Sequence, residues 1–333
     1  MISQEFEFHA PKQLSEALNL LQRYGDDAKV LAGGMSLVPL MTLGLVLVWG
    51  ANWPIVKIGL HDISPFWLGA TRLALGTLCL FALVALRGQL RLPQRRDLLM
   101  IADVGLLQMC AFMVLFNVAL QYVDAGRAVI VAYTTPLWVA PGAVLLLGER
   151  MTPRMVVGFL LGVAGVLVLF NPAALDWSDR QVVLGNALLM LAAIIWAALI
   201  LHVRVHKWVS GPLELAPWQA LIALVPTTII ALLFEDFGRI AWTGRVIGVI
   251  AYNGVLATAF GVWAMVSVSR VLPAISSSLG FLGAPVVGYL SAAWLLGEPI
   301  TTTLSIGLAL IVGGVFLVLT ADATGRSGRR TAR

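Results

Sequence analysis

The sequence is poor in cysteine, histidine and charge. Its 333 residues include two cysteines and four histidines, and charged residues make up only 12%. Both cysteines, Cys79 and Cys110, fall within long apolar runs, so neither a disulfide framework nor a zinc site is expected. The sequence also lacks a nucleophile elbow, a phosphate-binding loop and paired metal ligands, and these absences argue against an enzyme.

The sequence is instead rich in apolar residues, which form long runs. Hydrophobic residues make up 59% of the chain and the mean hydropathy is +0.91, which is more apolar than an ordinary soluble domain. A helix needs about 20 apolar residues to cross a hydrocarbon core about 30 Å thick. We therefore predict an all-α membrane protein with ten transmembrane helices. Their ranges are residues 40–60, 65–86, 98–120, 126–147, 153–171, 182–203, 214–234, 244–268, 274–296 and 300–320.

Most of the basic residues lie in predicted loops on one side of the membrane. If the ten helices alternate in direction, 16 of the 22 lysines and arginines lie in loops on the side of the amino terminus and five lie on the other side. Short basic loops stay in the cytoplasm, so we expect both termini there, in the inner (plasma) membrane. The net charge of +5 then reflects contact with the lipid bilayer and predicts no nucleic-acid partner.

The chain contains an internal repeat of nearly half its length. A shift of 149 residues aligns LLGE at 146–149 with LLGE at 295–298. The first two predicted helices align at a shift of 147 residues, which pairs Arg72 with Gln219. A repeat this long indicates two homologous halves rather than a solenoid.

The first 41 residues differ from the rest of the chain. An amphipathic pattern that ends before Gly25 predicts a short helix, and residues 29–32 predict a strand before a glycine pair. This segment resembles the start of the FAD-binding medium subunit of xanthine and carbon monoxide dehydrogenases, in which an AGG turn approaches the FAD pyrophosphate. The rest of a flavin domain is absent, so we expect a fusion remnant or a misplaced start, and no cofactor.

Three motifs further along resemble one transporter family. They are WGANW at residues 49–53, Arg72 in the second predicted helix, and a doubled pattern of proline, eleven residues and GE before a glycine-rich helix. Together they resemble the drug/metabolite transporter superfamily, EamA type. The resemblance implies repeats at 42–171 and 182–321, a basic tail at 322–333, and transport, commonly efflux, of a small metabolite, amino-acid-like compound or drug.

The number of helices in each half indicates how such a transporter works. Five is an odd number, so the second half enters the membrane from the opposite side and the halves are inverted. Inverted repeats with a binding site at their interface are a recurrent basis for alternating access. Pro136 and Pro285 occupy matching positions near the middle of their helices, where proline interrupts helical hydrogen bonding, and we predict that they act as hinges.

Polar residues inside the predicted helices form the candidate site, because a charge in a bilayer is costly and usually faces a cavity. For Arg72 the alternative is a structural pair or a side chain that extends to the interface, and extension is favoured for Lys57. The predicted substrate-binding residues are Trp49, Asn52, Trp53, Arg72, Asn117, Tyr133, Thr134, Trp138 and Gln219.

Two further assignments concern acidic residues. Asp103 is the only acid placed inside a predicted helix, and we predict that it carries a coupled proton; the alternative is a solvated helix end. Glu149 and Glu298 lie at helix ends, where capping or pairing with a base is expected.

The expected substrate is a small molecule, and the sequence leaves open whether the protein forms a homodimer. Two other functions remain as alternatives. One is a membrane-tethered flavin-binding oxidoreductase component, and the other is a non-transporting membrane scaffold.

The predicted topology can be tested by cysteine labelling. In a cysteine-free background, single cysteines at Leu90 and Gly328 should be labelled only from the cytoplasmic side, and those at Ser178 and Arg239 only from outside, because the basic loops stay inside. A membrane-impermeant maleimide, applied to intact cells and to inverted vesicles, measures this. Labelling of Gly328 in intact cells would reverse the orientation.

Overall fold

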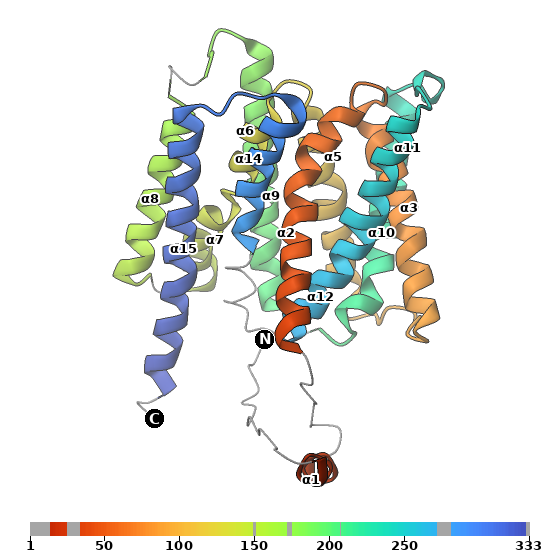
Figure 1. The fold of residues 1–333 in the computed structure, drawn as a ribbon, viewed down its shortest axis with the longest axis vertical. Helices are drawn as coiled ribbons and strands as arrows, with labels where there is room; N and C mark the ends of the chain where they lie inside the picture. The colour runs from red at the N-terminus through yellow and green to blue at the C-terminus, as the bar shows by residue number, and fades with distance from the viewer. Residues whose placement is uncertain are drawn as a thin grey trace.

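The computed structural model describes residues 14–24, 34–148, 151–171, 175–206, 208–271 and 281–330, and every regular element in these ranges is a helix. The predicted amino-terminal helix is confirmed as α1 (Leu14–Tyr24), which lies apart from the bundle (Figure 1). The predicted strand at 29–32 lies outside the described residues. The bundle itself contains α2 (Gly34–Gly59), α3 (Pro65–Leu86), α4 (Leu98–Asp103), η2 (Val104–Phe112), α5 (Met113–Ala119), α6 (Ala125–Ala132), α7 (Thr135–Leu147), α8 (Pro153–Leu169), α9 (Arg180–Val205), α10 (Pro212–Phe234), η3 (Phe237–Arg239), α11 (Gly244–Ala251), η4 (Tyr252–Phe260), α12 (Gly261–Val271), α14 (Gly283–Leu296) and α15 (Thr302–Arg330).

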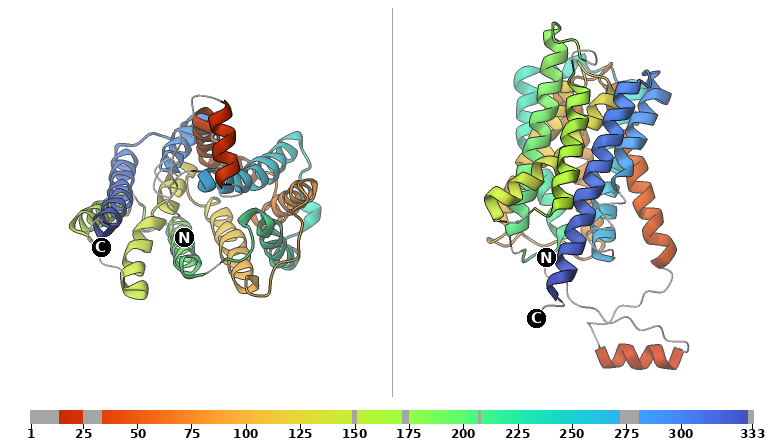
Figure 2. Two further views of the ribbon diagram at one scale, coloured as in Figure 1. Left: turned by 90° about the horizontal axis from the view of Figure 1, so that it is seen from below. Right: turned by 90° about the vertical axis from the view of Figure 1, so that its left-hand side faces the viewer.

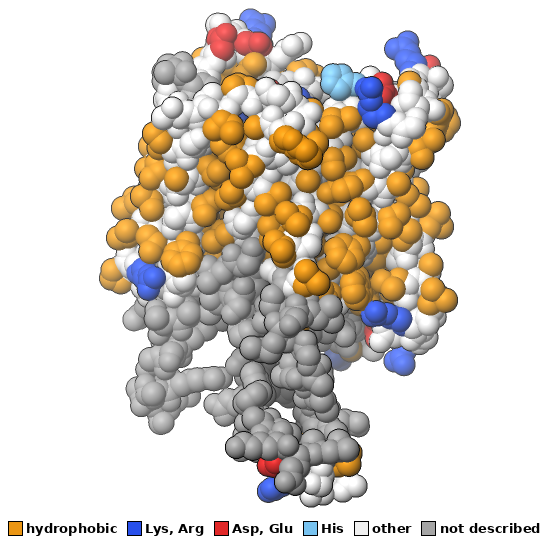
Figure 3. Space-filling model, viewed as in Figure 1, with side chains coloured by type: hydrophobic (Ala, Val, Ile, Leu, Met, Phe, Trp, Pro, Cys, Tyr) orange, Lys and Arg blue, Asp and Glu red, His pale blue; other side chains and the backbone are white. Residues whose placement is uncertain are grey.

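The chain is an all-helical membrane protein. Eight helical stretches in the described residues are long and apolar enough to cross a membrane, and two shorter apolar helices, Pro153–Leu169 and Gly283–Leu296, accompany them. Apolar side chains cover the middle of the face shown in Figure 3, and charged side chains gather toward its ends. The last helix continues to Arg330, so the segment predicted as a tail from residue 322 begins as helix.

The two halves of the chain, α2 to α8 and α9 to α15, are interlocked. The most extensive helix contacts join α8 to α15, α3 to α10, α2 to α14 and α3 to η4, and each of them crosses between the halves, as does that of α7 with α9. Figure 1 shows α8 beside α15 along most of their length, and Figure 2 shows the same pair from two other directions. The main core cluster of buried residues accordingly includes residues from both halves.

The third apolar stretch of each half contains a π-helix at the same place in the repeat. The first is η2 and the second is η4, nine residues each, and they are related by a shift of 148 residues. A π-helix bonds each N–H to the carbonyl five residues earlier, and such turns occur mostly as short insertions, frequently at functional sites. The α-helical period of about 3.6 residues does not hold across these segments.

The fourth apolar stretch of the first half is broken. The helix stops at Ala132 and starts again at Thr135, so that Pro136 falls in the first turn of α7. Pro285 similarly lies near the start of α14. Proline fits a first turn because its missing N–H has no intrahelical partner there. The sequence predicted an interruption at Pro136, and the structure confirms one.

The doubled LLGE sequence marks where helices end. Gly148 and Gly297 follow α7 and α14 with φ of 66° and 68°, in the left-handed region that costs glycine little. The next helix then begins after a threonine in each half: the Thr152 side chain accepts the N–H of Met155, and that of Thr301 accepts the N–H of Leu304. The repeat therefore encodes a helix stop followed by a capped helix start.

Glycines allow α8 and α15 to approach closely. A Cβ on Gly158 would lie 2.7 Å from the carbonyl oxygen of Gly314, and a Cβ on Gly314 would lie 2.5 Å from that of Gly158. Backbone atoms cannot move aside as a flexible side chain can. Small residues at such a contact favour helix association in lipid, where burial of apolar surface supplies no driving force.

We expect Gly314→Ala to destabilise the protein by about 1–3 kcal/mol, the usual cost of overpacking. Gly313→Ala is the matched control, because a Cβ there meets only Leu161 Cδ2, at 3.6 Å. Thermal unfolding in detergent, followed by fluorescence-detected size exclusion, compares the two. Equal melting temperatures would show that α8 and α15 separate easily.

Candidate functional site

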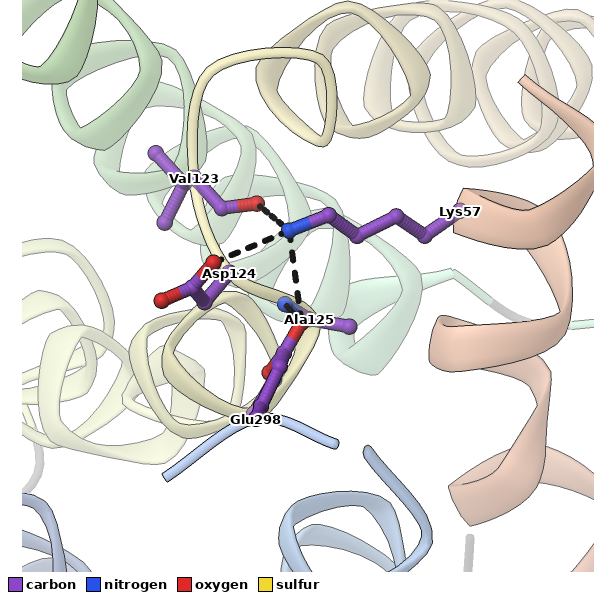
Figure 4. A network of polar contacts seen from close by, with 6 residues as sticks. Lys57, Val123, Asp124, Ala125 and Glu298 are labelled. Carbon is purple, nitrogen blue, oxygen red and sulfur yellow. Dashed lines mark hydrogen bonds and ion pairs between the residues drawn. The ribbon is translucent and has the colours of Figure 1, made fainter. Parts of the chain in front are cut away.

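At one end of the bundle, Lys57 joins three parts of the chain. Its Nζ, at the last turn of α2, donates to Val123 O at 3.0 Å and contacts Asp124 Oδ1 at 3.1 Å and Glu298 Oε1 at 3.3 Å (Figure 4). The sequence favoured a lysine that extends to the interface, and the structure shows a paired one. We call this side of the bundle the Lys57 end.

Glu298 also caps a helix of the other half. Its two carboxylate oxygens accept the backbone N–H groups of Ala125 and Gly126, both at 2.8 Å. These donors open α6 and have no partner within the helix. A negative charge at a helix amino terminus is favourable, so the expected capping role of Glu298 is confirmed.

Glu235 caps α3 in the same way at the Lys57 end. Its carboxylate accepts Ser64 Oγ at 2.6 Å, Phe66 N at 3.1 Å and Trp67 N at 2.9 Å. Glu235 directly follows α10 and therefore belongs to the second half, whereas α3 belongs to the first. Sequence reasoning missed this residue; an acid just beyond the end of an apolar run was the available signal.

The opposite end of the bundle is held by Asp97, which is 0% exposed. Its carboxylate accepts the backbone N–H groups of Val209 and Ser210, at 3.3 and 2.9 Å, and lies 3.0 Å from His206 Nε2. Here a first-half acid holds the turn that leads into α10 of the second half. Burial opposes the charge, but the hydrogen bonds from His206, Ser210 and Val209 outweigh it and lower the pKa of Asp97.

The predicted residues Trp49 and Arg72 meet at η4. Trp49 Nε1 donates to Ala257 O at 3.0 Å, and Arg72 Nε donates to Thr258 Oγ1 at 3.0 Å. Tyr252, also in η4, donates its hydroxyl to Val48 O at 2.7 Å. Two helices of the first half are therefore hydrogen-bonded to one π-helix of the second half.

Three other predicted residues are buried close to the first-half helices. Trp53 packs on Phe116, with ring centroids 5.0 Å apart. Asn117 donates Nδ2 to Pro65 O at 3.0 Å, which ties α5 to the start of α3. The Oδ1 atoms of Asn52 and Asn117 are buried without a hydrogen-bond partner among the described residues. Each could therefore accept a hydrogen bond from a ligand or a water.

Tyr133, Thr134 and Trp138 gather at the break between α6 and α7. Thr134 is fully buried; its Oγ1 donates to Val131 O at 2.7 Å and accepts Trp138 Nε1 at 3.2 Å. Trp138 in turn lines an apolar pocket of about 470 Å³ between α7 and α9. Its lining residues are Trp138, Leu146, Leu147, Ile194, Ala197, Ala198, Leu201, His202 and Val205.

Asp103 lies beside this pocket and is paired with His202. The distance from Asp103 Oδ2 to His202 Nδ1 is 2.9 Å, and the histidine is 46% exposed. The pair joins the third apolar stretch of the first half to α9 of the second. Sequence reasoning drew no inference from His202, because its partner is 99 positions away along the sequence.

The predicted site residues thus fall into separate groups. Arg72 and Trp49 contact η4, whereas Trp138 belongs to the pocket between α7 and α9, whose lining does not include Arg72. Gln219, the counterpart of Arg72, lies where α10 approaches Gly105 of η2, since a Cβ on that glycine would be 2.7 Å from Gln219 O. The two counterparts therefore lie at equivalent contacts of the two π-helices.

Interlocked halves with interrupted helices, and ionisable groups within the apolar region, define a membrane transporter built from two repeats. The chain belongs to the EamA-like transporter family, whose model matches residues 36–171 and 183–320. This bears out the resemblance in the transporter region. Nothing in the known relatives supports the flavin-protein resemblance of the amino-terminal segment.

Several curated proteins are similar over most of the chain. The uncharacterized transporter YoaV of Bacillus subtilis is 26% identical over 84% of this chain and 96% of its own. A protein of Salmonella typhimurium named "Probable amino-acid metabolite efflux pump" is 29% identical, over 88% and 97% respectively. One from Streptantibioticus cattleyicolor named "Probable terminal-alkyne amino-acid exporter" is 27% identical, over 82% and 90%. A crystal structure at 25% identity superimposes with a TM-score of 0.60 over 85% of this chain and 98% of that chain.

Asp97→Asn should destabilise the folded protein by about 1–3 kcal/mol, because the substitution removes the charge and turns an amide donor toward other donors. Asp176→Asn is the control, since Asp176 accepts from Ser178 within one exposed loop. Unfolding in detergent measures both.

The same carboxylate predicts a pH dependence. A lowered pKa means that the stabilising charge of Asp97 is fully present above the ordinary value of aspartate, about 3.9, and is lost as the pH falls through the lower folded-state value. Asp97→Asn should therefore remove part of the acid destabilisation of the wild type below about pH 4. If Asp97→Asn loses stability below about pH 4 as steeply as the wild type does, other groups cause the acid destabilisation.

Proposed function

We propose that this transporter exports a small amino-acid-like metabolite by alternating access between two inverted five-helix halves. The relatives named as amino-acid metabolite efflux pumps support the substrate class and the direction. The interlocking of α2 with α14 and of α7 with α9 supports a mechanism in which one half moves against the other. The charge distribution supports an inner-membrane location with both termini in the cytoplasm.

The observation that carries the proposal is a cation without a counterion. Arg72 lies well inside the apolar helix α3, and no carboxylate of the described residues is within ion-pair distance of it. A charge in the membrane region is costly unless it pairs or faces water. An anionic group on the substrate, such as a carboxylate, would supply the missing partner.

The buried arginine Arg127 gives the contrast. Its Nε donates to Asn186 Oδ1 at 2.8 Å and its Nη2 donates to Leu169 O. Arg127 therefore ties α6 to α8 and α9 through both parts of the guanidinium, as a structural arginine does. Within the described part of the chain, Arg72 has one such bond, through Nε.

Asp103 is our candidate for the coupled proton. Its pairing with His202 places a proton acceptor beside a pocket that is lined by α7 of the first half and α9 of the second. The pair, rather than the carboxylate alone, would take up and release the proton.

The broken helices supply the remaining parts of the mechanism. Trp49, Asn52 and Trp53 on α2, with Tyr133, Thr134 and Trp138 at the break in the fourth stretch, are the proposed contacts for the rest of the substrate. Pro136 and Pro285 are the proposed hinges, because they lie at the starts of α7 and α14, where a new helix begins.

Transport should be measured in inverted vesicles with a panel of the twenty labelled L-amino acids. We expect accumulation of at least one of them, and Arg72→Gln should raise its half-saturation concentration tenfold or more, because a charge-assisted hydrogen bond is worth about 1.5–3 kcal/mol. Asp103→Asn should abolish stimulation by an imposed pH gradient. Lack of flux for the whole panel would contradict the proposed substrate class, and an unchanged affinity per folded molecule would remove Arg72 from the site.

A further inference from the structure

Thr258 holds the guanidinium of Arg72 in one orientation. Its Oγ1 donates to Asn253 O at 2.8 Å and accepts the N–H of Arg72 Nε at 3.0 Å. Because the hydroxyl proton is committed to Asn253, a lone pair is left for the arginine. Thr258 is only 4% exposed, so both bonds form where water does not compete for them.

The π-helix is what makes this arrangement possible. Asn253 and Thr258 are five residues apart within η4, the spacing at which a π-helix places a residue over an earlier carbonyl. On the opposite side, α3 comes so close that a Cβ on Gly76 would lie 2.6 Å from Thr258 Cγ2. The Thr258 side chain is therefore held between the backbone of η4 on one side and Gly76 of α3 on the other.

This contact leaves one part of the arginine available. A guanidinium has five N–H donors, and Nε–H is used by Thr258. The described residues provide no hydrogen-bond acceptor for the two Nη atoms. Since Nε is occupied, an anion cannot bind side-on through Nε and Nη, and the end-on pair of Nη atoms remains, a geometry that fits a planar carboxylate bidentately.

We propose that Thr258 is a positioning residue that presents the Nη atoms of Arg72 to the carboxylate of the transported molecule. The inference rests on the proposed function, and it adds the residue that orients the anion-binding group. The neighbouring phenol of Tyr252 donates to Val48 O, and the described residues show no hydrogen bond between it and Arg72.

The internal repeat does not reproduce this anion site at the equivalent position of the other half. A shift of 148 residues places Cys110 of η2 where η4 has Thr258, and Gly105 where η4 has Asn253. The counterpart of Arg72 on α10 is Gln219, a neutral amide. The carboxylate is therefore bound where α3 meets η4 and not where α10 meets η2.

The test compares Thr258→Val, which removes the hydroxyl, with Thr258→Ser, which keeps it. Cys110→Val is the control at the equivalent position of the other π-helix. The probes are the best-transported L-amino acid of the vesicle panel and its carboxamide, which lacks the anionic group. Half-saturation concentrations are measured per folded molecule, counted by fluorescence-detected size exclusion.

We expect Thr258→Val to raise the half-saturation concentration for the amino acid about threefold to tenfold, the effect of one lost hydrogen bond, and to leave that of the carboxamide unchanged. Thr258→Ser and Cys110→Val should behave as wild type. If Thr258→Val yields no folded protein, Thr258→Ala provides the same comparison.

Two results would overturn the inference, and they differ from failure of the proposed function. If Arg72→Gln weakens binding of the amino acid but Thr258→Val does not, the arginine binds the anion without help from the threonine. If Thr258→Val weakens the amino acid and the carboxamide equally, the hydroxyl serves general packing. Absence of flux for every amino acid, by contrast, counts against the proposed function itself.

Discussion

A helix that starts inside or beside a membrane must find partners for its first N–H groups, because lipid offers none. At three places in this protein a carboxylate from the other half provides them. Glu298 caps α6, Glu235 caps α3, and Asp97 holds the turn before α10. These contacts occur at both ends of the bundle, and each of them is also a bond between the halves. The interlocked packing results from this requirement as much as from apolar contact.

The caps also limit how the halves can move. A motion that separated Glu298 from α6 would leave buried donors unpaired, at a cost of about 1–3 kcal/mol for each. Motion is less costly where the helices are already irregular: at the two π-helices and at the break before Thr135. The halves can thus keep their capped ends together while the interior between them changes shape.

Much of the fold could be predicted from the sequence, because apolar runs, glycines and the doubled LLGE encode local structure directly. The helix stop at Gly148 and the interruption at Pro136 are of this kind. The site was harder to predict. A shift of the sequence against itself shows which residues are equivalent, but not which touch, and the pairs Asp103–His202 and Arg72–Thr258 both cross between the halves. The π-helix η2 also changes which side chains share a helix face, and nothing in the apolar pattern of the sequence signals it.

The contact between α8 and α15 has a consequence for biosynthesis. Chains are made from the amino terminus at roughly 5–20 residues per second, and α15 leaves the ribosome well after α8. Helix α8 therefore enters the bilayer before its partner exists, and its row of glycines faces lipid or an insertion factor until α15 has been made. Newly made protein would pass through a stage in which most of the bundle is in place but one groove stays open, and α15 closes it.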